Sequence, residues 1–308
     1  MAGVSTSLDP IVLLSVIVGT IAALILAGVL AALIFFTIRY RDRGPGAASE
    51  IPQIHGHPGL EIAWTAVPLA VLAVVFALSL VTLSQIGRGA TFGSLEPPLR
   101  ISVIGHQWWF EFRYPDGTVT ANEPHIPTGV PIELELASAD VIHDLWIPEL
   151  GAKSDVIPSH TGQTNTLRLF TARSGVFSGA CAEFCGLEHA WMRVRVVAEP
   201  RAAFDTWLAA QAAPAVATSA RGQTVFTTAV CVSCHVVRGL AAGTSIGPDL
   251  THLASRTTIA AGVLANTPDA LRAWISDPQR YKPGVLMPKV PLTDADLEAL
   301  VVYLGSLR

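Results

Sequence analysis

The sequence has few charged side chains. Lys, Arg, Asp and Glu make up 14% of the 308 residues, whereas hydrophobic residues make up 51%, and the mean hydropathy is +0.47. In an average soluble protein about a quarter of the residues are charged. The shortage of charge therefore indicates that part of the chain lies in a lipid bilayer.

Positive charge is also scarce, and it does not cluster. The formal net charge is −4, the isoelectric point is about 6.1, and no stretch is rich in Lys or Arg. A protein that binds nucleic acid through its phosphates needs a basic surface. We therefore expect no nucleic-acid partner.

Two long segments contain no charged side chain, Ile11 to Ile38 and Ile62 to Gly87. Each exceeds the roughly 20 residues that cross a hydrocarbon core, and the first is too long for the apolar part of a cleaved signal peptide. Arg39, Arg41 and Arg43 follow the first segment, and no Lys or Arg precedes it. The two segments are expected to form a helical hairpin in the inner (plasma) membrane. Positive charge marks the cytoplasmic side, so the loop that joins the two helices should be cytoplasmic. Both termini and the remaining chain would lie on the periplasmic (outer) face.

Period-two alternation begins at about Leu99. In IELELA (132–137) three apolar residues alternate with glutamates, and TLRLF (166–170) and MRVRV (192–196) repeat the pattern. Turn-forming stretches such as YPDG, PTGVP and SG separate these runs. Alternation bounded by turns predicts short strands with one buried face. Residues 96–200 are therefore expected to form an all-β sandwich or barrel.

The pattern becomes helical after about Ala198. Residues 208–220, LAAQAAPAVATSA, have no charge and little bulk, which is typical of a mobile linker. We place this linker at 201–218. The chain finishes with LTDADLEALVVYLGSLR, in which Thr293 is positioned to cap an apolar-periodic helix. Residues 219–308 are therefore predicted to form a small α-helical domain.

The pentapeptide Cys231-Val-Ser-Cys234-His235 has the C-x-x-C-H spacing. In this arrangement two thiols bind a haem covalently and the next histidine is held at the iron. A redox-active dithiol is the alternative, but it would need an oxidoreductase fold around it. We predict haem c, attached at Cys231 and Cys234, with His235 as an axial ligand.

Met287 is the candidate for the second axial ligand, because a thioether raises the potential of a c-type haem. It lies in KPGVLMPK, where prolines stiffen an extended loop, and not on an apolar helical stripe. GPDL at 247–250 resembles the segment of small cytochromes c whose proline carbonyl accepts a hydrogen bond from the ligand imidazole. Residues 219–308 thus look like a fused cytochrome c domain.

Only four cysteines are present, and the haem accounts for two. The others lie in CAEFCGLEHAWM (181–192), together with His189 and Met192. A Cys181–Cys185 disulfide is one interpretation in an oxidising compartment, but it leaves the histidine and the methionine unexplained. Soft sulfur ligands with imidazole favour copper. One cysteine more than a blue-copper site needs indicates two copper ions bridged by both sulfurs.

The loop alone is an incomplete site, because each copper ion then needs an imidazole and a weak axial ligand. Of the nine histidines, His143 in VIHDLWIPELGAK is the best candidate for the upstream imidazole. The main-chain carbonyl of Glu183, between the two cysteines, is the candidate for the remaining weak ligand. The chain has only three methionines, so both internal ones, Met192 and Met287, lie where a metal site needs them.

Four motifs together resemble those of a known family. GHQWWFEFRYPDG, HDLWIPELGAKSDVIP, CAEFCGLEHAWM and LEIAWTAVP are similar to cytochrome c oxidase subunit II with its dinuclear copper A site. The appended haem domain resembles that of the caa3-type. The resemblance implies a multidomain membrane protein with a transmembrane hairpin (1–95), an all-β cupredoxin barrel and an all-α cytochrome c domain.

The resemblance also implies an electron relay within a proton-translocating cytochrome c oxidase. The chain would accept electrons through haem c and relay them through copper A to subunit I, which reduces oxygen to water and pumps protons. This chain would hold no oxygen-reducing site. The implied partners are subunit I with its haems and copper B, subunit III, and a periplasmic cytochrome c or an upstream respiratory complex as donor.

Carried over residue by residue, the resemblance assigns specific roles. The implied copper A ligands are His143, Cys181, the carbonyl of Glu183, Cys185, His189 and Met192. The Glu183 carboxylate is implied to reach a magnesium ion at the interface with subunit I. Trp108 falls at the position of the tryptophan that receives electrons, and Glu61 at the mouth of a proton channel. The alternatives are a core role for Trp108 and an interfacial carboxylate at a helix start for Glu61.

Three rival functions make different expectations. Nitrous oxide reductase shares the copper loop, but it is soluble and carries a large histidine-rich propeller. A quinol-oxidase subunit II with a metal-free cupredoxin domain would lack the two thiols, which are present here. A free-standing membrane-anchored electron carrier would not copurify with a subunit I.

Overall fold

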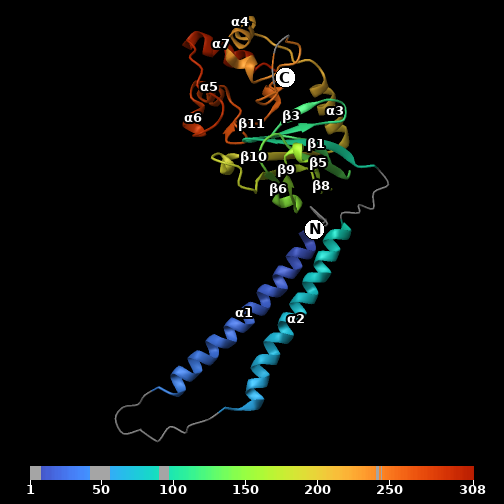
Figure 1. Ribbon diagram of the computed structural model, residues 1–308, viewed down its shortest axis with the longest axis vertical. Helices are drawn as coiled ribbons and strands as arrows, with labels where there is room; N and C mark the ends of the chain where they lie inside the picture. The colour runs from blue at the N-terminus through green and yellow to red at the C-terminus, as the bar shows by residue number, and fades with distance from the viewer. Residues whose placement is uncertain (1–7, 42–55, 90–96, 241–242, 244) are drawn as a thin grey trace. The chain divides into compact units, whose positions relative to one another are not determined.

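The computed structural model describes residues 8–41, 56–89, 97–240, 243 and 245–308 (Figure 1). They form two compact units, a pair of long helices up to Gly89 and a larger unit from residue 97 onward. The larger unit contains a β domain followed by a helical domain. Arg43, one of the arginines behind the predicted membrane orientation, lies outside the described residues.

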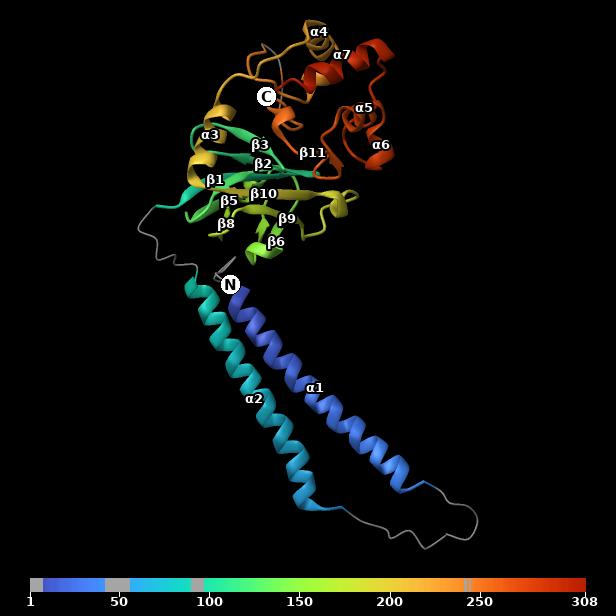
Figure 2. The ribbon, with the colours of Figure 1, turned by 180° about the vertical axis from the view of Figure 1, so that it is seen from behind.

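The first unit consists of α1 (Leu8–Arg39) and α2 (Pro58–Gly89), which run antiparallel (Figures 1 and 2). Within them, Pro10–Arg39 and Pro58–Ser84 are long and apolar enough to cross a membrane, and their apolar side chains are exposed. Exposed apolar surface of this extent suits lipid and not water. The two predicted apolar helices are thus confirmed.

The β domain is a sandwich of two five-stranded sheets, ordered β3-β2-β1-β5-β8 and β4-β10-β9-β6-β7. The strands are β1 (Leu99–His106), β2 (Trp109–Arg113), β3 (Val119–Ala121), β4 (His125–Pro127), β5 (Ile132–Ser138), β6 (His143–Ile147), β7 (Ala152–Val156), β8 (Asn165–Leu169), β9 (Gly175–Cys181) and β10 (Arg193–Glu199). Most pairs are antiparallel, but β1 runs parallel to β5 and β4 parallel to β10. The predicted all-β fold is confirmed.

Strand β5 shows how the sequence pattern produces the core of this sandwich. Ile132, Leu134 and Leu136 are buried, whereas Glu133 is half-buried and Glu135 is exposed. Successive side chains of a strand point to opposite faces, so the apolar ones of β5 meet those of the second sheet, such as Phe177 of β9. Burial of each such side chain stabilises the fold by about 1.5–3 kcal/mol.

Residues 201–212 differ from the expected linker. Arg201–Ala212 forms helix α3, whose Phe204 is buried in the core of the β domain. Trp207, on the same helix face, stacks on His125 of β4 with ring centroids 4.2 Å apart. An apolar face at helical spacing therefore outweighs the low bulk of the segment. The segment between α3 and the next helix is limited to residues 213–219.

The C-terminal domain packs four short helices around its own core. They are α4 (Ala220–Thr228), α5 (Pro268–Ser276), α6 (Pro278–Tyr281) and α7 (Asp294–Leu304). Thr293 caps α7 as expected, since its side chain accepts a hydrogen bond from the backbone N–H of Asp296. A small hairpin, β11 (Thr258–Ile259) with β12 (Leu264–Ala265), precedes α5.

Gly222 permits the close packing of α4 on α7. A Cβ at this position would overlap the carbonyl oxygen of Ala299 and the Cβ of Tyr303. We expect Gly222→Ala to push the helices apart and to lower the stability of this domain by about 1–3 kcal/mol, or roughly 10 °C in Tm. Thermal unfolding followed by circular dichroism measures this. The exposed Thr227→Ala on the same helix is the control, and an equal Tm for Gly222→Ala and wild type would contradict the packing argument.

Candidate metal centres

The two strands that carry His143 and Cys181 bring these residues to one end of the second sheet. His143 begins β6 and Cys181 ends its antiparallel neighbour β9. The loop that follows returns to the sheet at Met192, whose carbonyl accepts a hydrogen bond from the N–H of Cys181 (2.9 Å). A second bond, from the N–H of Ala182 to the carbonyl of Asp144 (3.0 Å), fixes the loop to β6.

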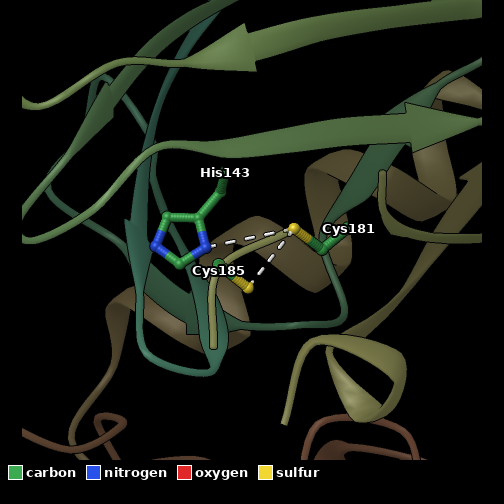
Figure 3. A group of neighbouring side chains, drawn as sticks. All are labelled: His143, Cys181 and Cys185. Atoms are coloured by element: carbon green, nitrogen blue, oxygen red, sulfur yellow. Dashed lines mark hydrogen bonds between the residues drawn. The ribbon is translucent and has the colours of Figure 1, made fainter. Parts of the chain in front are cut away.

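The donor atoms of the six predicted copper ligands lie in a continuous cluster. The Cys181 sulfur is 3.7 Å from the Cys185 sulfur, 4.0 Å from Nδ1 of His143 and 3.2 Å from the carbonyl oxygen of Glu183. Figure 3 shows the imidazole and the two thiols converging. The Cys185 sulfur is 3.7 Å from Nδ1 of His189 and 3.9 Å from the Met192 sulfur.

The two thiols are free and do not form the alternative disulfide. The pKa of Cys181 is lowered, first because Cys185 donates a hydrogen bond to its sulfur and second because of the adjacent His143 ring. The pKa of Cys185 is raised, because it shares its proton with Cys181 and because it is buried. Both sulfurs can ionise only if cations compensate them, because two buried negative charges side by side are unfavourable. The donor set of soft sulfur and imidazole therefore fits copper.

Asp140 orients the imidazole of His143, and the sequence analysis did not single it out. Its carboxylate accepts hydrogen bonds from Nε2 of His143 (2.8 Å) and from the N–H of Gln107 (2.7 Å). Burial would raise the pKa of Asp140, but the hydrogen bonds from His143 and the backbone outweigh it and lower the pKa. With Nε2 bonded to this carboxylate, Nδ1 is the nitrogen left for a metal.

Trp108 lies directly against the loop between Cys181 and Met192, which carries most of the predicted copper ligands and is called the copper loop below. Its indole N–H donates to the carbonyl of Cys185 (2.9 Å), and the side-chain amide of Gln107 donates to the same oxygen (2.7 Å). Gly186, with φ of +113°, leaves room for the indole, because a Cβ there would lie 3.1 Å from its ring. Trp108 is 7% exposed and belongs to the core of the β domain. It therefore combines the packing role with a contact to the backbone of Cys185, a predicted ligand.

The C-x-x-C-H motif begins in the 3₁₀ turn Val230–Ser233 after α4, and Cys234 and His235 directly follow this turn. Nδ1 of His235 donates to the carbonyl of Pro248 (2.8 Å), which is the bond that the GPDL segment predicted. Burial lowers the pKa of His235, which favours the neutral ring that binds metals. Gly247 lies so close that a Cβ would be 2.6 Å from the imidazole. Nδ1 is thus occupied, and Nε2 is the nitrogen left for an iron.

Comparison with known proteins identifies both domains. Residues 119–199 match the periplasmic domain of cytochrome c oxidase subunit II, and residues 219–308 match cytochrome c. A cytochrome c oxidase subunit 2 from Alkalihalophilus pseudofirmus is 37% identical over 303 residues, which cover 94% of this chain and 85% of the relative. The chain belongs to the cytochrome c oxidase subunit II family. The predicted family is thereby confirmed.

Two further relatives of this subunit II are similar along most of their length. Cytochrome c oxidase subunit 2 of Bacillus sp. strain PS3 is 33% identical over 284 residues, covering 86% of this chain and 79% of its own. That of Bacillus subtilis is 31% identical over 303 residues, covering 89% and 82%. With its C-terminal cytochrome c domain, this subunit II is consistent with the caa3-type fusion and an electron-relay role in a haem-copper oxidase.

The loop that carries Met287 in this subunit II is held by Gln279 of α6. The side-chain amide of Gln279 donates to the carbonyls of Val285 (2.6 Å) and Met287 (3.3 Å), and its oxygen accepts from the N–H of Gly284 (2.8 Å). These hydrogen bonds were not predicted from the sequence, because a glutamine in a short helix is not part of any recognisable motif. Three bonds from one side chain fix the backbone at the predicted axial ligand and at the two positions Gly284 and Val285 that precede it.

We expect Gln279→Ala to loosen the loop without unfolding the haem domain. Loss of these hydrogen bonds costs about 1–2 kcal/mol, so the methionine should leave the iron at a lower denaturant concentration. The red absorption band of the sulfur–iron bond, followed during a guanidinium titration, measures this. Arg280→Ala, at the next exposed position, is the control. Equal guanidinium midpoints for loss of this band in the variant and in wild type would show that Gln279 does not stabilise the loop that carries Met287.

Two predicted residues of subunit II remain, Glu61 and the side chain of Glu183. Glu61 is in the first turn of α2, in the helical unit. The Glu183 side chain is exposed, although its carbonyl faces Cys181. The carboxylate of this residue is therefore free to face outward while its backbone belongs to the metal cluster.

Proposed function

We propose that this subunit II relays electrons from haem c to a dinuclear copper centre and then to subunit I. The observation that carries the proposal is the convergence of two buried thiols, two imidazoles, a thioether and a carbonyl in one cluster. Copper ions held by these residues would supply one-electron redox chemistry, and the two thiols would let a pair of ions share one charge. No bond of a substrate is made or broken by this chain.

The protein's part in this relay is to hold the copper ligands still. We assign as copper ligands His143, Cys181, the carbonyl of Glu183, Cys185, His189 and Met192. Backbone bonds from Cys181 and Ala182 fix the loop to the sheet, and Asp140 fixes the ring of His143. Hydrogen bonds of this kind around metal ligands keep the ligands from rearranging. A rigid site lowers the barrier to electron transfer, because few atoms move when the charge changes.

In the second domain, Cys231 and Cys234 would attach the haem, and His235 and Met287 would be its axial ligands. The proline carbonyl on Nδ1 sets the tautomer of His235, and Gln279 sets the position of the methionine loop. The thioether keeps the potential high enough to accept electrons from a periplasmic cytochrome c or an upstream respiratory complex.

Three further roles complete the proposal. The outward-facing carboxylate of Glu183 would meet a magnesium ion at the interface with subunit I, so that one residue touches both the copper cluster and the partner. Trp108, bonded to the carbonyl of Cys185, would conduct electrons to the copper ligands. Glu61, in the first turn of α2, would lie at the mouth of a proton channel.

The proposed setting is the inner membrane, with both helices spanning it. Arg39 and Arg41 at the end of α1 would face the cytoplasm, and the metal domains would face the periplasm. Subunit I and subunit III would be the partners within the membrane.

One preparation tests this function. The full chain, produced with copper and haem maturation and purified in mild detergent, should contain two copper ions and one covalent haem. Its EPR spectrum should show one unpaired electron shared by both coppers, and its visible spectrum a low-spin haem. A subunit I should copurify from the native membrane. A single isolated copper would refute the dinuclear site, and absence of subunit I would favour the free-standing carrier.

A further inference from the structure

Glu123 is a buried carboxylate that the electron relay does not use. It lies between β3 and β4 of the β domain, called the copper domain below, and is 3% exposed. Its oxygens accept hydrogen bonds from the N–H (2.8 Å) and the hydroxyl (2.6 Å) of Thr257 and from the hydroxyl of Thr258 (3.4 Å). Both threonines belong to the C-terminal domain, which is the predicted haem domain. The carboxylate of one domain is therefore satisfied by donors of the other, through charge-assisted bonds that are stronger than neutral ones.

The hairpin that follows Thr257 continues this contact. Ala260, Ala261 and Gly262 at its tip have φ of +53°, +56° and +79°. The carbonyl of Ala261 accepts from the N–H of Arg193 at the start of β10 (3.3 Å), and the Ala261 side chain is buried with Trp109 and Ala121. Left-handed conformations are costly for alanine and persist where the surroundings hold them. Here the surroundings are the surface of the copper domain.

A third contact reaches the copper loop itself. Lys282 and Glu188 form an ion pair with 3.7 Å between Nζ and Oε2, and the two residues are only 2% and 1% exposed. Burial lowers the pKa of Lys282 to about 8, while Glu188 acts in the opposite direction. A buried ammonium without an opposite charge would be strongly unfavourable. Beside this pair, Gly284 lies so close to Leu187 that a Cβ there would be 2.9 Å from its methyl group.

We propose that these three contacts form one docking surface that fixes the haem domain on the copper domain, with Glu123 as its principal positioning residue. The inference rests on the proposed relay and specifies it. Electrons would pass between the two centres inside a fixed assembly, and not during chance encounters of a domain that swings on residues 213–219. An external donor would then meet the haem domain, because Trp109 and the Leu187 side of the copper loop are already engaged.

Amide hydrogen exchange of the full, metal-loaded chain tests this docking without measuring activity. The N–H of Thr257 bonds to Glu123, whereas the N–H of Arg193 bonds to the distant hairpin tip. Glu123→Ala should therefore accelerate exchange at both amides by about tenfold, since it removes charge-assisted bonds from an interface that opens as a unit. Glu135→Ala, which removes an exposed carboxylate of β5, should change neither rate.

Thr257→Val approaches the same bond from the haem domain and leaves the copper domain's sequence intact. It should also accelerate hydrogen exchange at the backbone amide of Arg193. The docking can then be tested even if Glu123→Ala does not fold. Faster exchange at Thr257 alone, with Arg193 unchanged in both variants, would overturn the proposal. Copper and haem spectra of the same samples separate the two claims, because the relay function fails only if wild type lacks the shared copper signal or the low-spin haem.

Discussion

We expect the substitution Cys185→Ser to abolish the EPR signal that two copper ions would share, and to leave the chain with at most one copper. The sulfur of Cys185 lies between the Cys181 sulfur, Nδ1 of His189 and the sulfur of Met192. A serine hydroxyl stays protonated at neutral pH and is a hard ligand, which copper with soft partners does not favour. Without the second bridging sulfur, the two ions have no common ligand pair.

The matched control for this result is Ala190→Ser, which adds a hydroxyl at an exposed position of the same loop. Copper content by elemental analysis and EPR line shape are measured on both variants, and circular dichroism confirms that the β domain is folded. Cys181→Ser should reproduce the defect, because the two sulfurs act together. A normal shared signal in folded Cys185→Ser would refute the bridging role.

We expect removal of the thioether of Met287, the proposed axial ligand, to lower the reduction potential of the haem by roughly 0.1 V or more, a part of the roughly 0.8 V range that axial ligands set. The Met287→Ala variant should also lose the red absorption band and bind added cyanide at the vacated position. Since 59 mV corresponds to tenfold for one electron, a fall of 0.1 V reduces the equilibrium for electron uptake from a fixed donor by about fiftyfold.

Leu286→Ala is the control for this substitution, because Leu286 is the exposed neighbour in the same loop. Spectroelectrochemical titration of both variants gives the potentials. An unchanged potential and an unchanged red band in Met287→Ala would show that another residue is the axial ligand. In that case the hydrogen bonds from Gln279 to this loop would not be evidence that Met287 is the axial ligand.

The sequence predicted those parts of the fold that depend on local pattern. Uninterrupted apolar runs defined α1 and α2, and the alternation in Ile132–Ala137 defined a strand with one buried face. The two cysteine motifs predicted where donor side chains gather, because ligand spacing within a motif is local. His143 was the best candidate for the upstream imidazole, which was expected at a strand end, and the structure places its ring beside the Cys181 sulfur at the start of β6.

The parts that were missed depend on contacts between distant segments. Nothing in the sequence pairs Glu123 with Thr257, since the bond forms only when two domains meet. Asp140 looks like an ordinary turn residue until folding places it against Nε2 of His143. Helix α3 was assigned to the linker because its alanines suggested mobility, whereas Phe204 and Trp207 find partners in the β domain. Tertiary packing decided each of these positions.

The order in which the two centres are reduced tests the central claim most directly. The oxidised, metal-loaded chain is mixed with less than one equivalent of a reduced periplasmic cytochrome c, and the haem and copper absorbances are followed by stopped flow. If haem c feeds the copper site, the haem is reduced first and is then reoxidised at the rate at which the copper band disappears, independently of protein concentration. Copper reduction that precedes the haem, or that proceeds at the same rate in Met287→Ala, would contradict it.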